Sequence, residues 1–218
     1  MIIRKRRALN RPGTATHEKG LNRLLSILDA ARDVLVEEGY ARFTMRKVAT
    51  RAGISIGNLN YYYRAKEDLM RDLVEYVVNA YLEEFERLKA NAGDDAEAQL
   101  RAVLAFWIED LGTHETSVFF PELWALANHD EFVADLVDET YRAARAPIRE
   151  LLPRLNPALS PREVERLALY ICAAMEGLTV FAGHDKPWAG ERSALAALMI
   201  DNFLTLAKGR PAAAGSCD

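Results

Sequence analysis

Residues 43–69, FTMRKVATRAGISIGNLNYYYRAKEDL, decide the fold of this 218-residue chain. Four apolar residues in the first part of the stretch have the i, i+3, i+4 and i+7 spacing of one helix face: Met45, Val48, Ala49 and Ala52. Gly53 ends that helix, and the side-chain oxygen of Ser55 is placed to cap a second one. Two helices this short cannot bury much surface alone. The pattern therefore predicts a helix-turn-helix, whose second helix lies in the major groove of DNA.

Three spaced motifs run through this stretch: Thr44-x-Arg46-x-Val48-Ala49, Ala52-Gly53-Ile54-Ser55-x-Gly57-x-Leu59 and Tyr62-Tyr63-x-x-Lys66-Glu67-x-Leu69. Together they resemble the DNA-binding domain of TetR-family regulators, over about Leu24 to Met70. The resemblance implies an all-α fold. In such a fold an N-terminal three-helix helix-turn-helix domain is joined through a connecting helix to a larger helical domain for ligand binding and dimerisation.

The residues expected to contact DNA lie in and around the two short helices. Asn58 and Asn60 are the candidates for reading bases, because an amide side chain can bind adenine N6 and N7 with two hydrogen bonds. By resemblance, the contacts to the DNA backbone come from Thr44, Tyr61, Tyr62 and Lys66. The rest of the predicted interface is Arg46 for guanine or phosphate, Ser55, Ile56 for a thymine methyl, and Gly57, which lets the helix backbone approach DNA.

Two positions depart from the family pattern. Asn60 stands where the family most often has Tyr, so operator sequences of the family cannot be transferred to this chain. Ala65 replaces the usual Ser or Asn cap of the next helix, a loss of about 1 kcal/mol at most. Tyr63 matches a family position that packs inward, and we expect it to be buried.

The charge of the chain is divided unevenly. Residues 1–66 carry a net charge of +9 and residues 67–218 a net charge of −13, within a total of −4. A basic head on an acidic body suits a phosphate-binding domain, although a solvated basic face without a partner is the alternative. The arm at residues 1–20, with Arg4-Lys5-Arg6-Arg7 and Arg11, either enters a minor groove or adds nonspecific affinity as a disordered tail.

Composition and motifs exclude several classes of protein. No apolar run approaches the length of about 18 residues that a membrane span needs, and the basic start is not followed by the apolar segment of a signal peptide. Cys172 and Cys217 fit a reducing cytoplasm. Metal-binding His or Cys spacings, a nucleophile elbow and a phosphate loop are all missing. We therefore expect no cofactor, no metal and no catalytic residue.

Helical periodicity recurs along the chain, and strand signals are nearly absent. A helix ended by Gly39 comes first, and a connecting helix begins near Lys66 and runs towards Leu88 without a flexible linker. Further helices are expected at about 96–112, 116–128 and 131–153. Pro121 and Pro147 should start, kink or split the last two of these.

The last third of the sequence predicts a dimer interface. Ser160-Pro161-Arg162-Glu163 is a capping box with Pro at the first helical position, and apolar stripes follow at about 160–183 and 191–208. By resemblance these two helices pair with their twofold mates in a four-helix bundle, although a monomer could bury both stripes internally. A twofold dimer places two heads about 34–36 Å apart, which suits a palindromic operator in double-stranded DNA.

The body holds candidates for an effector pocket, namely Phe106, Trp107, Asp110, His114, Phe120, Trp124, Tyr141, Met175 and Phe181. Glu122 is a further polar candidate. Aromatic residues at helical spacing are usually core packing, and that alternative applies to each of them. As a set they favour a small-molecule effector that is largely apolar.

These observations predict a cytoplasmic, sequence-specific DNA-binding regulator that acts as a homodimeric repressor and is released by a ligand. The expected domains are a basic arm at 1–20, the helix-turn-helix domain at 21–66, the ligand-binding and dimerisation domain at 67–208 and a flexible tail at 209–218. The alternatives are a nonspecific DNA-binding dimer and a helical-bundle enzyme with an unrecognised site. Sequence preference in DNA binding separates the regulator from the first, and turnover would reveal the second.

Overall fold

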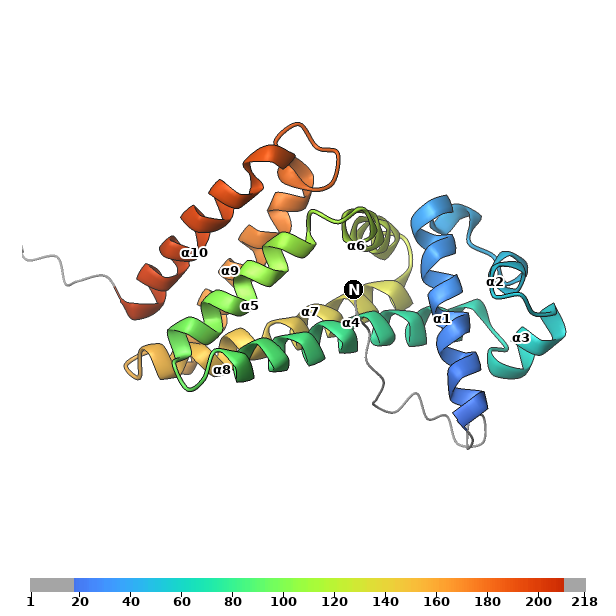
Figure 1. The fold of residues 1–218 in the computed structure, drawn as a ribbon, viewed down its shortest axis with the longest axis horizontal. Coiled ribbons are helices and arrows are strands. Elements are labelled where there is room, and N and C mark those ends of the chain that lie inside the picture. The colour runs from blue at the N-terminus through green and yellow to red at the C-terminus, as the bar shows by residue number, and fades with distance from the viewer. Residues whose placement is uncertain (1–17, 210–218) are drawn as a thin grey trace, which may run out of the picture. The chain divides into compact units, whose positions relative to one another are not determined.

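The computed structural model describes residues 18–209, and all regular structure in that range is helical (Figure 1). The elements are α1 (Glu18–Glu38), the 3-10 helix η1 (Tyr40–Arg42), α2 (Met45–Arg51), α3 (Ile56–Tyr62), α4 (Lys66–Asn91), α5 (Ala96–Asp110), α6 (His114–Ala127), α7 (Glu131–Ala144), α8 (Ala146–Leu155), α9 (Pro161–Ala182), the 3-10 helix η2 (Ala189–Glu191) and α10 (Arg192–Lys208). The all-α prediction is confirmed. Within the described range, no helix has the length and apolar character that crossing a membrane requires.

The two ends of the sequence fall outside the described residues. Residues 1–17 include the basic run of the predicted arm, and residues 210–218 include Cys217 and nearly all of the predicted tail. The roles assigned to these segments stay predictions.

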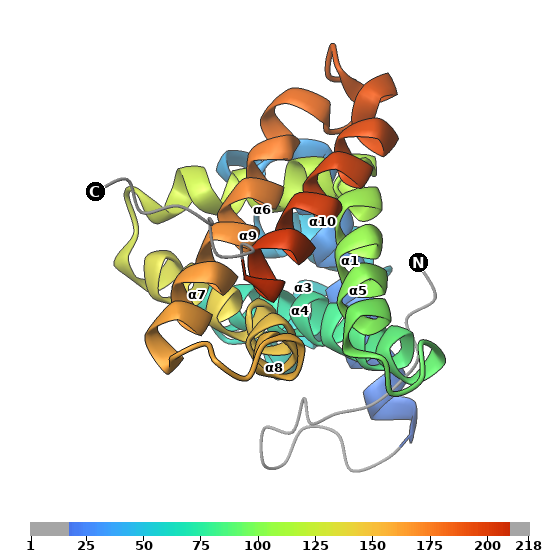
Figure 2. The same ribbon diagram turned by 90° about the vertical axis from the view of Figure 1, so that its left-hand side faces the viewer.

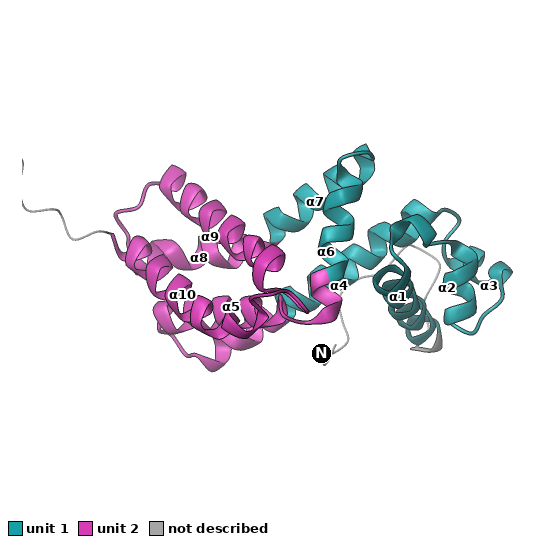
Figure 3. Ribbon diagram, turned by 90° about the horizontal axis from the view of Figure 1, so that it is seen from above, with its two compact units in different colours: residues 1–83, 118–143 teal, residues 84–117, 144–218 magenta. Residues whose placement is uncertain are grey.

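Packing divides the chain into two compact units (Figure 3). The first unit takes the described residues up to Glu83 together with Val118–Ala143. The second takes Glu84–Ser117 together with the described residues from Ala144 onward. Helices α4 and α6 each cross from one unit to the other without interruption. Each predicted domain is one continuous segment of the chain, whereas each of these units combines segments that are distant in sequence. The predicted boundaries stay a prediction.

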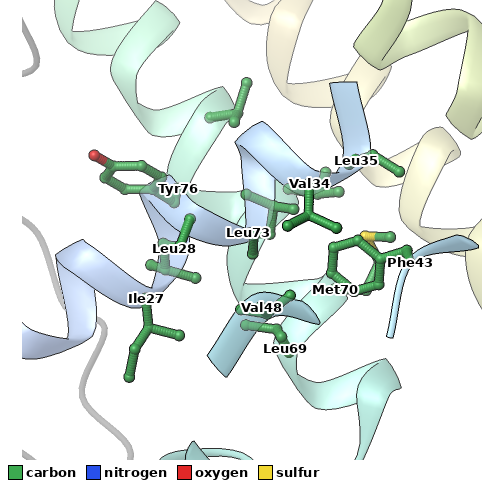
Figure 4. Packing of buried hydrophobic residues seen from close by; sticks show 14 of the residues in the cluster. Ile27, Leu28, Val34, Leu35, Phe43, Val48, Leu69, Met70, Leu73 and Tyr76 are labelled. Carbon is green, nitrogen blue, oxygen red and sulfur yellow. The ribbon is translucent and has the colours of Figure 1, made fainter. Parts of the chain in front are cut away.

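The core of the first unit joins α1, α2 and the start of α4 (Figure 4). Ile27 and Leu35 of α1 are completely buried, and they share one cluster with Val48 of α2 and with Leu69 and Leu73 of α4. Burying an aliphatic side chain of this size contributes about 1.5–3 kcal/mol relative to leaving it exposed. The short helices thus obtain from α1 and α4 the scaffold that they lack alone.

In the second unit, α5 packs on α8 and α10, and these two helices also pack on α9 (Figure 2). Helix α9 begins with the predicted capping box, in which Ser160 Oγ accepts the backbone N–H of Glu163 and the Glu163 carboxylate accepts that of Ser160. Two orphan donors of the helix start are satisfied in this way. The predicted start of this long helix is confirmed.

Proline acts differently in α6 and α8. The stretch expected at 131–153 is split, because α7 ends at Ala144 and α8 begins at Ala146, with Pro147 in its first turn. A proline costs little there, since its missing N–H would have no helical partner anyway. Pro121 instead lies inside α6, which continues through it.

Candidate nucleic-acid interface

Two side-chain caps and one glycine build the helix-turn-helix. Thr44 Oγ1 accepts the backbone N–H of Lys47 across 3.3 Å at the start of α2. Ser55 Oγ accepts the backbone N–H of Asn58 across 3.1 Å at the start of α3. Between the two helices Gly53 has a φ of +66°, which a residue with a Cβ rarely adopts. The predicted turn, and the cap at Ser55, are confirmed.

Helix α3 buries one face and exposes the other. Leu59 is completely buried, and Tyr63, directly after the helix, is also buried as expected. The exposed face carries Ile56, Gly57, Asn58, Asn60 and Tyr61. The structure therefore leaves exposed the side chains predicted to meet the bases of DNA.

Tyr61 and Tyr62 differ in exposure although they are neighbours. Their rings meet edge to face, with centroids 5.3 Å apart. Tyr61 is 65% exposed, whereas Tyr62 is half-buried and packs against the core of the first unit. Tyr61 is thus the more accessible of the two candidates for a contact to the DNA backbone.

The basic residues of α2 differ in whether they form an ion pair with α1. Lys47 pairs with Glu38, and Arg51 pairs with Glu37, both on α1. The hydrogen bond from Arg51 lowers the pKa of Glu37. Arg46 is exposed and makes no ion pair within residues 18–209, so its guanidinium is the one on α2 that is available to DNA.

Lys66 lies at the start of α4 on an aromatic platform. Its Nζ is 3.5 Å from the centroid of the Tyr40 ring and 5.4 Å from that of Phe43, a geometry in which the ring quadrupole attracts the cation. Burial lowers the pKa of Lys66, and the carboxylates of Glu67 and Asp130 oppose that shift. Sequence reasoning misses Tyr40, because no motif links it to Lys66. The available signal was an aromatic residue directly after the glycine that ends the first helix.

Comparison with known proteins identifies the fold around this surface. A family model described as "Bacterial regulatory proteins, tetR family" matches residues 27–73, and one described as "BetI-type transcriptional repressor, C-terminal" matches residues 96–205. An uncharacterized HTH-type transcriptional regulator in the dhlA 5′ region of Xanthobacter autotrophicus is 32% identical over 159 residues, which cover 72% of this chain and 77% of that relative. The chain belongs to the TetR family.

Other TetR-type proteins are similar over most of the chain. The HTH-type transcriptional regulator BetI of Escherichia coli strain SE11 is 28% identical over 177 residues, with 75% of this chain and 86% of the relative covered. The crystal structure of a putative TetR-family transcriptional regulator from Mesorhizobium loti has a TM-score of 0.72 at 18% identity, over 87% of this chain and 98% of that one. The structural likeness shows the fold alone. By its family, this TetR-type chain is a sequence-specific DNA-binding transcriptional regulator, as predicted.

Three of the residues predicted to line an effector pocket form an aromatic cluster in the first unit of this TetR-family protein. The indole N–H of Trp124 donates to the hydroxyl of Tyr141 across 2.8 Å. The ring of Phe120 lies 6.5 Å from that of Tyr141 and 6.0 Å from that of Tyr81. All four residues are half-buried.

A second group lies in the second unit. The Trp107 ring stacks on Phe85 at 5.6 Å, and Phe106 meets Phe85 edge to face at 6.0 Å. The indole N–H of Trp107 donates to Glu176 Oε1 across 3.1 Å. Met175 is completely buried in the same unit. Sequence reasoning misses Glu176, although a carboxylate directly after a long apolar run was the available signal.

The remaining predicted pocket residues occupy different surroundings. Asp110 Oδ2 accepts the hydroxyl of Thr116 across 2.6 Å. His114 is exposed, with its ring 5.2 Å from that of His184. Phe181 is 62% exposed, so it does not share the buried surroundings of Trp107. Within residues 18–209, no three His, Cys, Asp or Glu side chains gather as metal ligands.

The helix pair α9 and α10 exposes large apolar side chains, which are Leu169, Tyr170, Val180, Phe181 and Leu198. Along α9, Ala173 and Gly177 lie between Leu169 and Val180 at helical spacing, on the same face. A Cβ added at Gly177 would meet no atom within 4 Å. This chain alone therefore leaves an apolar surface with open space over Gly177.

Proposed function

We propose that this TetR-family protein is a repressor that binds a palindromic operator as a homodimer and is released by a small molecule. The observation that supports it most is the outer face of α3, where Asn58 and Asn60 are exposed on a helix capped by Ser55. Each amide can hold an adenine through two hydrogen bonds. Arg46 and Lys66 would bind phosphates and so fix the position of α3 along the duplex.

The homodimer would form through α9 and α10. Their exposed apolar side chains make a surface that soluble monomers rarely present, and the open space over Gly177 suits the close approach of a second helix. A twofold axis there would supply two heads for two half-sites about 34–36 Å apart.

The effector would be a largely apolar compound. The half-buried aromatic residues Phe120, Trp124 and Tyr141 support this proposal, because an apolar ligand that packs on exposed aromatic surface gains by removing it from water. The polar Trp124–Tyr141 pair would orient the ligand. Co-crystallisation or titration of candidate ligands tests this part, and a site already filled by side chains would refute it.

Release would be a population shift. The ligand would stabilise a body conformation in which the angle of α4 spreads the two heads out of register with the half-sites. Such a ligand changes DNA occupancy only by its difference in affinity for the two conformations. A cytoplasmic location follows from this function, because the operator lies there.

Selection of bound sequences from a random duplex library tests the proposal. Purified protein at near-physiological salt should enrich a palindrome, since a twofold dimer reads two related half-sites. Absence of enrichment by a folded dimer would favour the nonspecific DNA-binding alternative. Turnover of a substrate would instead favour the helical-bundle enzyme, against which the family assignment already weighs.

A further inference from the structure

We propose that Glu122 and Tyr40 are positioning residues for DNA binding, which hold the ammonium group of Lys66 where it meets a phosphate. Neither residue touches DNA in this proposal, because both act through Lys66. The inference rests on the phosphate contact of Lys66 in the proposed function. It adds two contacts that position Lys66, one between Glu122 and Tyr40 and one between Tyr40 and Lys66.

The first contact joins α6 to the segment after α1. Glu122 Oε2 accepts the backbone N–H of Tyr40 across 2.8 Å. The other carboxylate oxygen lies 3.3 Å from the point where a Cβ on Gly39 would sit, and Gly39 has a φ of +74°. Glycine is the residue that takes this φ without strain and leaves the carboxylate its room. The backbone before Tyr40 is therefore shaped to receive Glu122.

Glu122 caps the 3-10 helix η1 from a distance. The N-cap residue of η1, Gly39, has no side chain that could accept a hydrogen bond from the helix. A helix start leaves backbone N–H groups without helical partners, and a carboxylate is a strong acceptor for them. Loss of Glu122 would leave the backbone N–H of Tyr40 without this acceptor and would loosen the start of η1.

The second contact joins Tyr40 to Lys66. The ring of Phe43, a residue that is 2% exposed, lies nearly parallel to the Tyr40 ring, with the centroids 6.3 Å apart. The Lys66 Nζ lies on this platform, 3.5 Å from the Tyr40 centroid. An ammonium group has three N–H donors, so contact with a ring face still leaves donors for a phosphate. Holding the flexible lysine stem in advance lowers the entropy lost when DNA binds.

Simple electrostatics predicts the opposite change in DNA affinity when Glu122 is removed. A carboxylate in a DNA-binding unit repels phosphates, so its removal should strengthen binding by simple electrostatics. If Glu122 instead positions Lys66, its removal should weaken binding. The sign of the change therefore separates the two explanations.

The test measures the affinity of the full chain for a labelled duplex of mixed sequence over a range of salt concentrations. Glu122→Ala should weaken DNA binding by about tenfold, the scale of one lost charge-assisted hydrogen bond between Lys66 and a phosphate. It should also flatten the plot of log affinity against log salt concentration by about 0.9 per lost phosphate contact. Glu122→Gln keeps an amide oxygen that accepts the Tyr40 N–H, so it should retain most of the affinity. Asp138→Ala removes the same charge from an exposed position on α7 and should not weaken binding.

A double-mutant cycle links the effect to Lys66. Lys66→Ala should lower affinity and salt slope, and adding Glu122→Ala should cost nothing further. Tyr40→Leu should behave like Lys66→Ala, whereas Tyr40→Phe keeps the ring and should bind like the parent. Thermal unfolding of each variant identifies losses that are due to unfolding.

Two results would overturn the inference alone: tighter or unchanged binding by Glu122→Ala, or losses by Glu122→Ala and Lys66→Ala that simply add. An unchanged salt slope in Lys66→Ala would instead refute the phosphate contact of the proposed function, and the inference would fail with it.

Discussion

The hydroxyl oxygen of Ser55 accepts the backbone N–H of Asn58, so the side chain that starts α3 also holds a residue predicted to read a base. Ser55→Ala should lower the free energy of unfolding by about 1 kcal/mol, the usual cost of a lost helix cap. Urea denaturation measures this loss. Ser55→Asp keeps an acceptor and should restore stability, and equal stability of parent and alanine variant would contradict the role of the cap.

Asn58→Ala and Asn60→Ala should relax base preference. Each should cost about 1–3 kcal/mol on the selected operator if the amide binds a base with two hydrogen bonds, and much less on a duplex that lacks that base. Titrations with the operator and with single-base variants measure the difference. Lys66→Ala is the matched control, because a lost phosphate contact should weaken all duplexes alike. Equal losses on every DNA would refute base reading by the two asparagines.

Gly57→Ala should weaken DNA binding without destabilising the fold. A Cβ at this position would meet no atom nearer than Ser55 Oγ, at 3.9 Å, so the free protein has room for it. Alanine also favours a helix over glycine by about 1 kcal/mol, so stability should be unchanged or higher. Operator affinity should fall, since the added methyl group would lie between the helix backbone and DNA. A variant that binds as well as the parent would show that this backbone does not approach DNA.

Leu198→Glu should yield folded monomers. The Leu198 side chain is 69% exposed in the single chain, so a charge there disturbs no core, but it would be buried in the proposed dimer. Sedimentation velocity measures the change in mass, and circular dichroism checks the fold. Ala105→Glu on the exposed face of α5 adds the same charge elsewhere and should leave the dimer intact. A dimeric Leu198→Glu variant would place the interface elsewhere.

Cys172 should be unreactive in the folded protein. Burial raises the pKa of its thiol to about 12, and the nearby Glu176 carboxylate adds to the shift. At pH 8 only about one thiol in ten thousand is then ionised, and the thiolate is the reactive form. The folded state keeps this proton to a higher pH than the unfolded state does. The free energy of unfolding should therefore fall as the pH rises above 9.0, the ordinary pKa of a cysteine thiol.

Brief treatment with iodoacetamide, followed by peptide mapping, measures the reactivity of Cys172. The same treatment in urea is the control and should modify it fully. Rapid modification of native Cys172 would contradict its burial.

The helix-turn-helix could be predicted in detail because its signals are local in the sequence. A cap bonds to a backbone three residues further on, as at Thr44 and Ser55, and the turn between the helices needs one glycine, Gly53. Spacing alone reveals such features. The start of α9 was predictable for the same reason.

Contacts between distant segments could not be predicted in this way. Spacing marks which face of a helix is apolar, but not which helix will cover it. The sequence therefore indicates Trp107 and Trp124 as similar candidates, whereas they lie in different units with different hydrogen-bond partners, Glu176 and Tyr141. The predicted pocket as a whole stays a prediction, and the hydrogen bond from Tyr40 to Glu122 has no sequence signal at all.

The discontinuous composition of the first unit limits how such regulators can be recombined. Val118–Ala143 belongs to the same unit as the helix-turn-helix, although it lies far downstream in the chain. A chimera joined at one point after the DNA-binding segment would thus bring a foreign α6 to a native η1. The donor would have to supply an acceptor where Glu122 stands, and the recipient a glycine where Gly39 stands. Exchange of sensory modules should therefore succeed between parents that match at both positions, or with two junctions that leave residues 118–143 in place.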